Sequence, residues 1–309
     1  MNRLKVRPVL LFCFILVSSC ESNRDPSPLR FYVIGDWGRM GIPNQKVVAF
    51  QMNEWTKREN PKFIISTGDN FYYTGVTDTN DPHWQESFEK VYNGENLVRK
   101  PWQISLGNHD YSGNVEAEIA YSKISPRWKL PSRYYSIVET VNDGSRVRFI
   151  FIDTSPFEKS YYQIAELKDK VKAQDTTYQK KWLDSLTALN DVDRKIVVGH
   201  HHIYTGGVRK NDPNSVRTSL EPIFAKNKVN IYFCGHEHDL QHLKASDKPT
   251  HYFLSGAGAD LRPTGTINES LFSASVQGFM SVSILRKTLD VKMVDFNGNI
   301  IYSTQLAPQ

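Results

Sequence analysis

The sequence predicts an α/β domain built from layers of strands and helices. Five short apolar runs are rich in branched and aromatic side chains and are too short for helices, so each is typical of a buried strand. The runs cover residues 29–34, 62–67, 102–106, 195–198 and 229–234. Helical patterns lie between several of these runs. Strands that alternate with helices favour a layered α/β architecture.

The first 19 residues are predicted to be a secretory signal peptide. Three basic residues precede an apolar run, Val9 to Val17, that is too short to span a bilayer as a stable helix. The alternative of a buried helix is disfavoured by the same length and flanks. Residues 20–28 are predicted to be a tether before a catalytic domain at 29–309. Residues 21–28, with the sequence ESNRDPSP, contain two prolines and no apolar side chain.

The end of this segment suggests a membrane anchor. Val17-Ser18-Ser19-Cys20 resembles the lipobox of bacterial lipoproteins. The resemblance implies a lipidated Cys20 and an exported, membrane-anchored lipoprotein of the bacterial cell envelope, periplasmic or on the cell surface. The alternative is that Cys20 merely adjoins an ordinary cleavage site.

Cysteine content and charge exclude other classes of function. Cys13 leaves with the signal peptide and Cys234 is expected in the core, so no structural disulfide is predicted. The formal net charge of +5 is mild, and three of those positive charges lie in the removed segment. Nucleic-acid binding is therefore not expected, whereas a modestly basic face suits anionic phosphate substrates.

Three helices and a C-terminal meander complete the predicted elements. The expected inward faces are Val48, Met52 and Trp55; Tyr178, Trp182, Leu186 and Leu189; and Leu220, Ile223 and Phe224. Residues 279–304 alternate apolar and polar side chains and contain an Asn297-Gly298 turn. This pattern predicts a β-hairpin or meander that closes the sheet.

A glycine and then a metal-capable side chain follow each of the five strand runs. The pairs are Gly35-Asp36, Gly68-Asp69, Gly107-Asn108, Gly199-His200 and Gly235-His236. The carboxyl ends of strands in α/β sheets are where ligands bind, and glycine there lets the backbone turn sharply. The pattern therefore predicts five oxygen and nitrogen donors that converge in one metal site. Singly, each of these residues could equally be a cap, a turn residue or a surface histidine.

Together the motifs resemble those of the purple acid phosphatases, which are calcineurin-like metallophosphoesterases. The segments are GDWG at 35–38, GDNFY at 68–72, GNHD at 107–110, VVGH at 197–200 and GHEH at 235–238. The likeness is closest to the small, tartrate-resistant type. It implies an α/β/β/α sandwich with mixed sheets and an acid phosphatase that hydrolyses phosphate monoesters, small molecules or phosphoproteins, with a metal-bound hydroxide as nucleophile.

Coordination chemistry assigns the donors to two ions that share Asp69. Asp36, Tyr72 and His238 give the first ion a hard, anionic set, for which the family implies Fe(III). Asn108, His200 and His236 give the second a nearly neutral set that suits Fe(II), Zn or Mn. Tyr72 supplies a donor that many relatives take from a histidine at the position of Gly38 in this chain; its alternative is a core aromatic.

The remaining site residues are assigned less directly. The family implies that His109 contacts the phosphate or protonates the leaving group, and Asp110 is expected to orient it; otherwise His109 is structural. Small relatives commonly carry a further histidine some eight or nine residues after His200, where this chain reads GGVRK with Arg209 and Lys210. Arg209 can bind phosphate, as Asn108 can, but cannot serve as a proton donor. His202 is the candidate catalytic donor in its place, ahead of His201, although both could be solvated neighbours of the ligand His200.

Two questions stay open at this level. Residues 155–175 are predicted to form either an exposed loop over the cleft or an ordinary surface helix. The same two-metal core could also serve a phosphodiesterase or nucleotide hydrolase. A third possibility is a lipoprotein that captures phosphate or metal without turnover, against which the complete ligand set and His109 argue.

Overall fold

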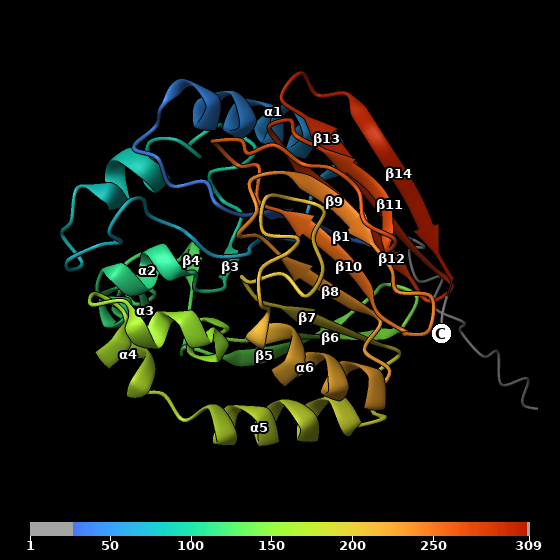
Figure 1. Cartoon of the computed structure of the whole chain (residues 1–309). Coiled ribbons are helices and arrows are strands. Elements are labelled where there is room, and N and C mark those ends of the chain that lie inside the picture. The colour runs from blue at the N-terminus through green and yellow to red at the C-terminus, as the bar shows by residue number, and fades with distance from the viewer. Residues whose placement is uncertain (1–26, 308–309) are drawn as a thin grey trace, which may run out of the picture.

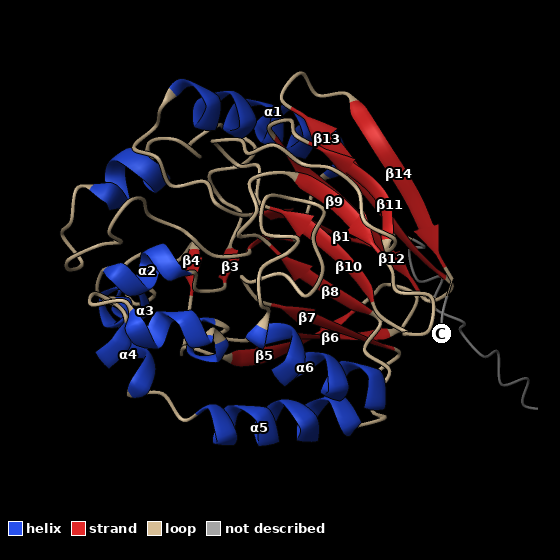
Figure 2. Cartoon of the chain, viewed as in Figure 1, coloured by secondary structure: helices blue, strands red, loops and turns tan. Residues whose placement is uncertain are grey.

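Two seven-stranded sheets pack face to face in the computed structural model, with helices on the outer side of each (Figures 1 and 2). The structure describes residues 27–307. The predicted α/β/β/α sandwich with mixed sheets is confirmed. The predicted signal peptide, Cys20 and residues 21–26 of the predicted tether lie outside the described residues. Within residues 27–307, no helix is long and apolar enough to cross a membrane.

The first sheet joins the N-terminal strands to the C-terminal meander. Its order is β14-β13-β12-β1-β2-β3-β4. The strands are β1 (Leu29–Ile34), β2 (Phe63–Ser66), β3 (Trp102–Ile104), β4 (Trp128–Lys129), β12 (Gly278–Leu285), β13 (Thr288–Asp295) and β14 (Ile300–Leu306). Strands β1 to β4 run parallel, whereas β12 pairs antiparallel with both β1 and β13. The predicted meander is present, and its Asn297-Gly298 turn joins β13 to β14 with Gly298 at φ 84°.

The second sheet has the order β11-β9-β10-β8-β7-β6-β5. Its strands are β5 (Tyr135–Thr140), β6 (Arg146–Phe151), β7 (Arg194–Val198), β8 (Ile231–Cys234), β9 (Leu240–Leu243), β10 (His251–Ser255) and β11 (Ser270–Ala274). Strands β6, β7, β8 and β10 are parallel neighbours. Because β1, β2 and β3 of the first sheet and β7 and β8 of the second all end at one edge, the residues that follow them meet there.

The helices cover the outer faces and the strand ends. They are α1 (Pro43–Glu59), α2 (Asn108–Ser112), α3 (Val115–Tyr121), α4 (Lys168–Lys172), α5 (Thr176–Ala188) and α6 (Ser215–Lys226), with a π-helical turn η1 (Trp84–Glu89) and 3-10 turns η2 (Ser155–Phe157) and η3 (Lys159–Gln163). Helices α5 and α6 lie against the second sheet, and α1 lies on the first (Figure 1). Residues 155–175 contain the two 3-10 turns and the short helix α4 with loops between them, so neither a loop nor a single surface helix describes the whole segment.

Helix α1 buries the predicted face, but α5 does not. Val48, Met52 and Trp55 are buried in α1. In α5 the buried positions are Gln179, Leu183 and Thr187, whereas Tyr178 and Leu189 are exposed and Trp182 and Leu186 are only partly buried. The reason is that the Gln179 amide exchanges two hydrogen bonds with the backbone of Asp153, which draws a polar residue inward. Because the prediction for α5 used hydropathy alone, the predicted inward positions each lie one residue before the positions that are buried.

Candidate metal centre

The five glycine-containing turns bring seven side chains together at the common edge of the two sheets. Asp36 follows β1, Asp69 follows β2 and His200 follows β7, and all three are buried. Asn108 begins α2 after β3, and His236 follows β8. Tyr72 and His238, two to three residues further along their loops, are also buried. The predicted convergence of donors is what the structure contains.

The first predicted donor set is tightly clustered around the Tyr72 hydroxyl. That oxygen lies 3.0 Å from Asp36 Oδ1, 2.9 Å from Asp69 Oδ2 and 3.1 Å from His238 Nε2. These distances match the spacing of about 3 Å between adjacent ligands that each bind one cation at about 2.1 Å. The donors therefore fit a cation.

The second predicted set is centred on His200. Its Nε2 lies 3.2 Å from Asn108 Oδ1, 3.1 Å from His236 Nδ1 and 3.4 Å from Asp69 Oδ2. The Asp69 oxygen is the same atom that contacts Tyr72, so the two sets share one carboxylate oxygen. Such sharing is the arrangement that a two-metal site needs.

Three of these residues have left-handed backbones. The φ angles are 57° at Asp36, 51° at Asp69 and 71° at His236. Few non-glycine residues adopt this conformation, although aspartate and histidine do so more often than most, and such backbones concentrate at functional sites. The His236 turn is held by its N–H, which donates to Asp36 Oδ2 at 3.0 Å, and by Arg262, which donates to its carbonyl at 2.8 Å.

Burial sets the charges of the donors in the metal-free protein. It raises the pKa of Asp36 far above its usual value, and it lowers the pKa of His238 to about 3. For His200 burial opposes the charged form, but the Asp69 carboxylate outweighs it and raises the pKa to about 9. The same pairing holds the pKa of Asp69 below its usual range against its own burial. The proton on His200 thus balances the negative charge of Asp69, which a bound cation would otherwise balance.

Gly38 lies directly beneath the loop that carries Tyr72. A Cβ at position 38 would come within 1.7 Å of the carbonyl oxygen of Asn70, and the Gly38 carbonyl accepts a hydrogen bond of 2.8 Å from Tyr72 N. The position where many relatives have a histidine is therefore filled here by the backbone of the tyrosine loop.

Asp110 does not orient His109, contrary to the expectation from sequence. Its carboxylate accepts from the backbone N–H groups of Asn70 and Gly107 at 2.8 and 2.7 Å and from the Asn70 side-chain amide at 2.9 Å. Asp110 is fully buried and points into the protein, where unpaired N–H groups would be costly. Its role is to tie the loop after β2 to the loop after β3.

His109 lies at the edge of the donor sets. Its ring is 4.3 Å from the Tyr72 ring between centroids, and its Nε2 is 4.0 Å from Asp69 Oδ2. The other ring nitrogen, Nδ1, lies 2.5 Å from the carbonyl oxygen of Tyr73. A carbonyl only accepts, so Nδ1 carries a hydrogen and Nε2 is protonated only in the imidazolium form.

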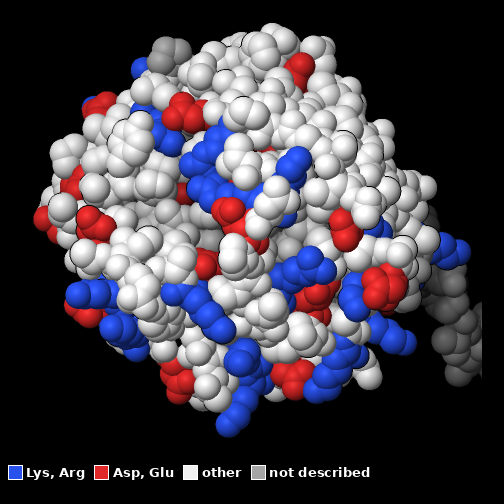
Figure 3. All heavy atoms as spheres, in the orientation of Figure 1, with Lys and Arg blue, Asp and Glu red and all other residues white. Residues whose placement is uncertain are grey.

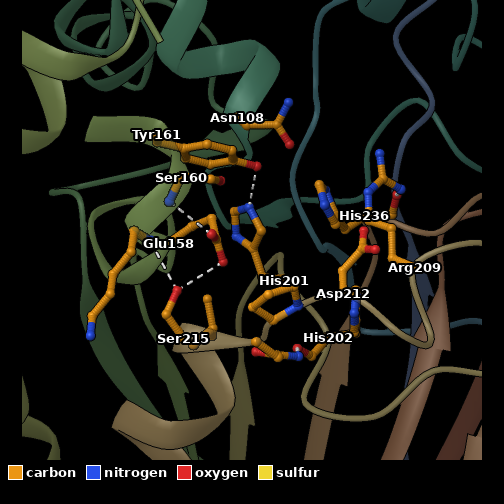
Figure 4. Close-up of a pocket in the computed structure, with 14 residues that line it drawn as sticks. Asn108, Glu158, Ser160, Tyr161, His201, His202, Arg209, Asp212, Ser215 and His236 are labelled. Atoms are coloured by element: carbon orange, nitrogen blue, oxygen red, sulfur yellow. Dashed lines mark hydrogen bonds between the residues drawn. The ribbon is translucent and has the colours of Figure 1, made fainter. Parts of the chain in front are cut away.

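A cavity of about 470 Å³ opens beside the second donor set (Figure 4). Asn108 and His236 lie on one wall, and the predicted substrate residues His202 and Arg209 line it as well. His202 is buried, and its Nδ1 has no hydrogen-bond partner within the described residues. His201 is enclosed differently, because its two ring nitrogens lie 2.7 Å from the hydroxyls of Thr154 and Tyr161.

Sequence reasoning missed Tyr161, which lines this cavity. It also missed Glu237, which pairs with the lining residue Arg209, and Arg262, which donates to the His236 carbonyl. Glu237 is buried and pairs with Arg209 at 3.0 Å. Tyr161 lies in η3, within the segment 155–175 for which an exposed loop over the cleft was one of the two predictions. That prediction was the only feature of the sequence that pointed to Tyr161. Figure 3 shows Lys and Arg side chains gathered over the middle of this face, with a few Asp and Glu beside them.

The fold has counterparts among solved structures. A protein described as "GAP50 the anchor in the inner membrane complex of Plasmodium" is 26% identical, with a TM-score of 0.77 over 92% of this chain and 90% of that one. The purple acid phosphatase PPD1 from yellow lupin is 17% identical, with a TM-score of 0.68 over 92% of this chain and 54% of its own. The lupin structure shows the shared fold alone.

Curated relatives are closer in sequence. Purple acid phosphatase 17 of Arabidopsis thaliana is 35% identical over 95% of this chain and 91% of its own length. Tartrate-resistant acid phosphatase type 5 of Homo sapiens is 32% identical over 96% of each. These relatives are plant and mammalian phosphatases and not bacterial membrane-anchored lipoproteins, so the predicted localisation as a lipoprotein of the bacterial cell envelope is wrong. That inference rested on a four-residue lipobox-like segment after an apolar run and on the lack of a disulfide role for Cys20, and these observations are too few to establish an anchor.

The model of the calcineurin-like phosphoesterase family matches residues 29–240. This range contains every predicted metal ligand, from Asp36 to His238. The chain therefore belongs to the calcineurin-like phosphoesterases and, within them, to the purple acid phosphatases of the small, tartrate-resistant type.

Proposed function

We propose that this chain is an acid phosphatase that hydrolyses phosphate monoesters at a dinuclear Fe(III)-M(II) centre, M being Fe, Zn or Mn. The observation that carries the proposal is the pair of donor sets that share one oxygen of Asp69. Asp36, Tyr72 and His238 would hold the ferric ion, since two carboxylates and a phenolate favour a trivalent ion. Asn108, His200 and His236 would hold the divalent ion. When bound, the two cations supply Lewis-acid stabilisation of the phosphate and lower the pKa of a bound water.

The chain's own residues complete this chemistry. Asn108 and Arg209 border the cavity and would bind phosphate oxygens. His109 would donate to the ester from Nε2, which carries a hydrogen only when the ring is protonated because Nδ1 already donates to Tyr73 O. The substrates would be small phosphomonoesters or phosphoproteins.

The experiment is metal analysis and an absorption spectrum of protein purified without chelator. A visible charge-transfer band is expected from phenolate bound to Fe(III), and it should disappear in Tyr72→Phe. The neighbouring Tyr73 is 69% exposed and supplies a matched control, because Tyr73→Phe should retain the band. A band that survives in Tyr72→Phe would refute the ferric assignment. Faster hydrolysis of bis-nitrophenyl than of mono-nitrophenyl phosphate would favour the phosphodiesterase alternative.

His109→Ala tests the proposed proton donor. Turnover should fall by about 10²-fold or more, as for other general acids. Metal content should stay at the wild-type level, because His109 is not among the proposed ligands. Unchanged turnover would remove this role.

A binding role without turnover is a second candidate. The Plasmodium relative is named as an anchor, and it is similar over most of both chains. The complete donor sets of this chain favour turnover instead. A protein that holds two metal ions per chain but hydrolyses no phosphate ester would favour the binding role.

A further inference from the structure

The Tyr161 hydroxyl lies on the wall of the cavity beside the metal centre. Tyr161 belongs to η3 and lines the cavity together with Asn108 and His236 of the second donor set. In Figure 4 its hydroxyl points to the side where Asn108 lies, and a hydrogen bond joins it to His201. The position of its hydrogen decides whether the hydroxyl can serve a substrate.

The neighbouring Thr154 fixes the tautomer of His201. Thr154 Oγ1 accepts hydrogen bonds from the backbone N–H groups of His200 and His201, at 3.3 and 3.1 Å. These two contacts occupy both acceptor sites of the hydroxyl, so its hydrogen donates to His201 Nδ1 at 2.7 Å. His201 Nδ1 is therefore an acceptor.

His201 in turn fixes the hydrogen of Tyr161. A neutral imidazole with an accepting Nδ1 carries its hydrogen on Nε2, which donates to the Tyr161 oxygen at 2.7 Å. The reverse direction would leave both ring nitrogens accepting, which only an imidazolate could do. The Tyr161 hydrogen is left without a partner among these residues.

We propose that Tyr161 is a catalytic residue that donates a hydrogen bond to the leaving-group oxygen of the ester. The inference rests on the proposed phosphatase function, in which the phosphate lies at Asn108 and His236 and the leaving group fills the cavity. The cavity of about 470 Å³ has room for an aryl or small alkyl group. Arg209 also lines the cavity but cannot serve as a proton donor, whereas the Tyr161 hydroxyl is a neutral donor.

The test is a series of phosphate monoesters whose leaving groups differ in basicity, assayed with Tyr161→Phe. The variant keeps the ring and loses only the hydroxyl. For alkyl and unsubstituted phenyl phosphate, kcat/KM should fall by about 10- to 100-fold, as when one positioned donor is lost. Nitrophenyl phosphate has a good leaving group and should lose less than about threefold. The dependence of rate on leaving-group pKa should thus become steeper, with metal content unchanged.

Two comparisons make the result specific. Tyr162 is adjacent, and its hydroxyl donates to the Pro156 carbonyl, so Tyr162→Phe should leave the dependence unchanged. His202→Asn tests the other candidate in the cavity. A steeper dependence in His202→Asn but not in Tyr161→Phe would overturn the proposal, and so would an equal loss on all esters.

Thr154→Val tests the tautomer argument separately. Without the Thr154 hydroxyl, His201 can carry its hydrogen on Nδ1, and Tyr161 then turns its own hydrogen to Nε2. Folded Thr154→Val should reproduce the steeper dependence, whereas Thr154→Ser should not. Wild-type protein that holds its metal but hydrolyses no ester would refute the phosphatase function and this role together. An active wild type with an unaltered Tyr161→Phe would refute this role alone.

Discussion

Glu237 and Arg209 form an ion pair in which a fully buried carboxylate fixes a side chain on the cavity wall. Glu237 Oε1 lies 3.0 Å from Arg209 Nη1 and accepts a second hydrogen bond of 3.2 Å from the backbone N–H of Arg209. Glu237 stands between the two predicted ligands His236 and His238. Arg209 is therefore positioned from within the loop that carries two of the predicted ligands.

A double-mutant cycle tests this pair. Glu237→Gln should raise KM for a phosphate ester several-fold and change kcat less, because Arg209 loses the contact that orients it. Arg209→Met should have a similar effect, and the double variant should add little to either single change. The cycle is measured by steady-state kinetics at fixed metal content. Additive effects would mean that the two residues act separately.

Lys170 should stabilise the helix that carries Asn108 and His109. Its Nζ donates to the carbonyl oxygens of three consecutive residues at the end of α2, at 2.8 Å to Tyr111, 2.9 Å to Ser112 and 2.6 Å to Gly113. A cation at a helix C-terminus is favourable. Lys170→Met should lower the free energy of unfolding by about 1 to 3 kcal/mol, measured with urea.

The exposed Lys172 provides the control for this change. Lys172→Met should leave the urea midpoint within about 0.5 kcal/mol of wild type. Equal effects of the two substitutions would show that the three carbonyl contacts contribute nothing specific.

The buried His242 should make the protein less stable in acid. Burial lowers the pKa of His242 to about 3, whereas an unfolded histidine titrates near 6.5. Between these values the unfolded chain binds more protons, so stability falls as the pH drops from about 6.5 towards 3. At pH 5 the loss from this one group is roughly 2 kcal/mol.

His242→Gln should remove part of this pH dependence. The measured quantity is the difference in unfolding free energy between pH 7 and pH 5, which should shrink by roughly that 2 kcal/mol. His251 Nδ1 lies 2.9 Å from His242 Nε2, and burial lowers the pKa of His251 to about 4, so it contributes in the same direction. An unchanged difference in His242→Gln would contradict the assignment.

Removal of metal should lower the melting temperature. A cation that binds only the folded protein, at a thousand times its Kd, stabilises it by about 4 kcal/mol. For a chain of this size a chelator should therefore lower Tm by roughly 10 °C, and Fe with Zn should restore it. His238→Ala should respond less to the chelator than wild type. Equal melting curves with and without chelator would contradict the metal assignment.

The sequence predicted most of what positions the site. Strand ends followed by glycine and a donor placed Asp36, Asp69 and His200 correctly, because the topology of parallel strands makes their carboxyl ends meet. The sequence did not predict the role of Asp110. The hydrogen-bond partners of this buried carboxylate lie in loops that come together only in the folded chain. The tautomer of His201 was hidden for the same reason.

The loop that crosses Gly38 has a consequence for the history of the site. A side chain at position 38 and the backbone of Asn70 and Phe71, which leads to Tyr72, would occupy the same volume. A histidine donor at 38 and a tyrosine donor at 72 are thus mutually exclusive solutions, each with its own main-chain route. No single substitution can convert one into the other, and Gly38→His should fail to rescue Tyr72→Phe.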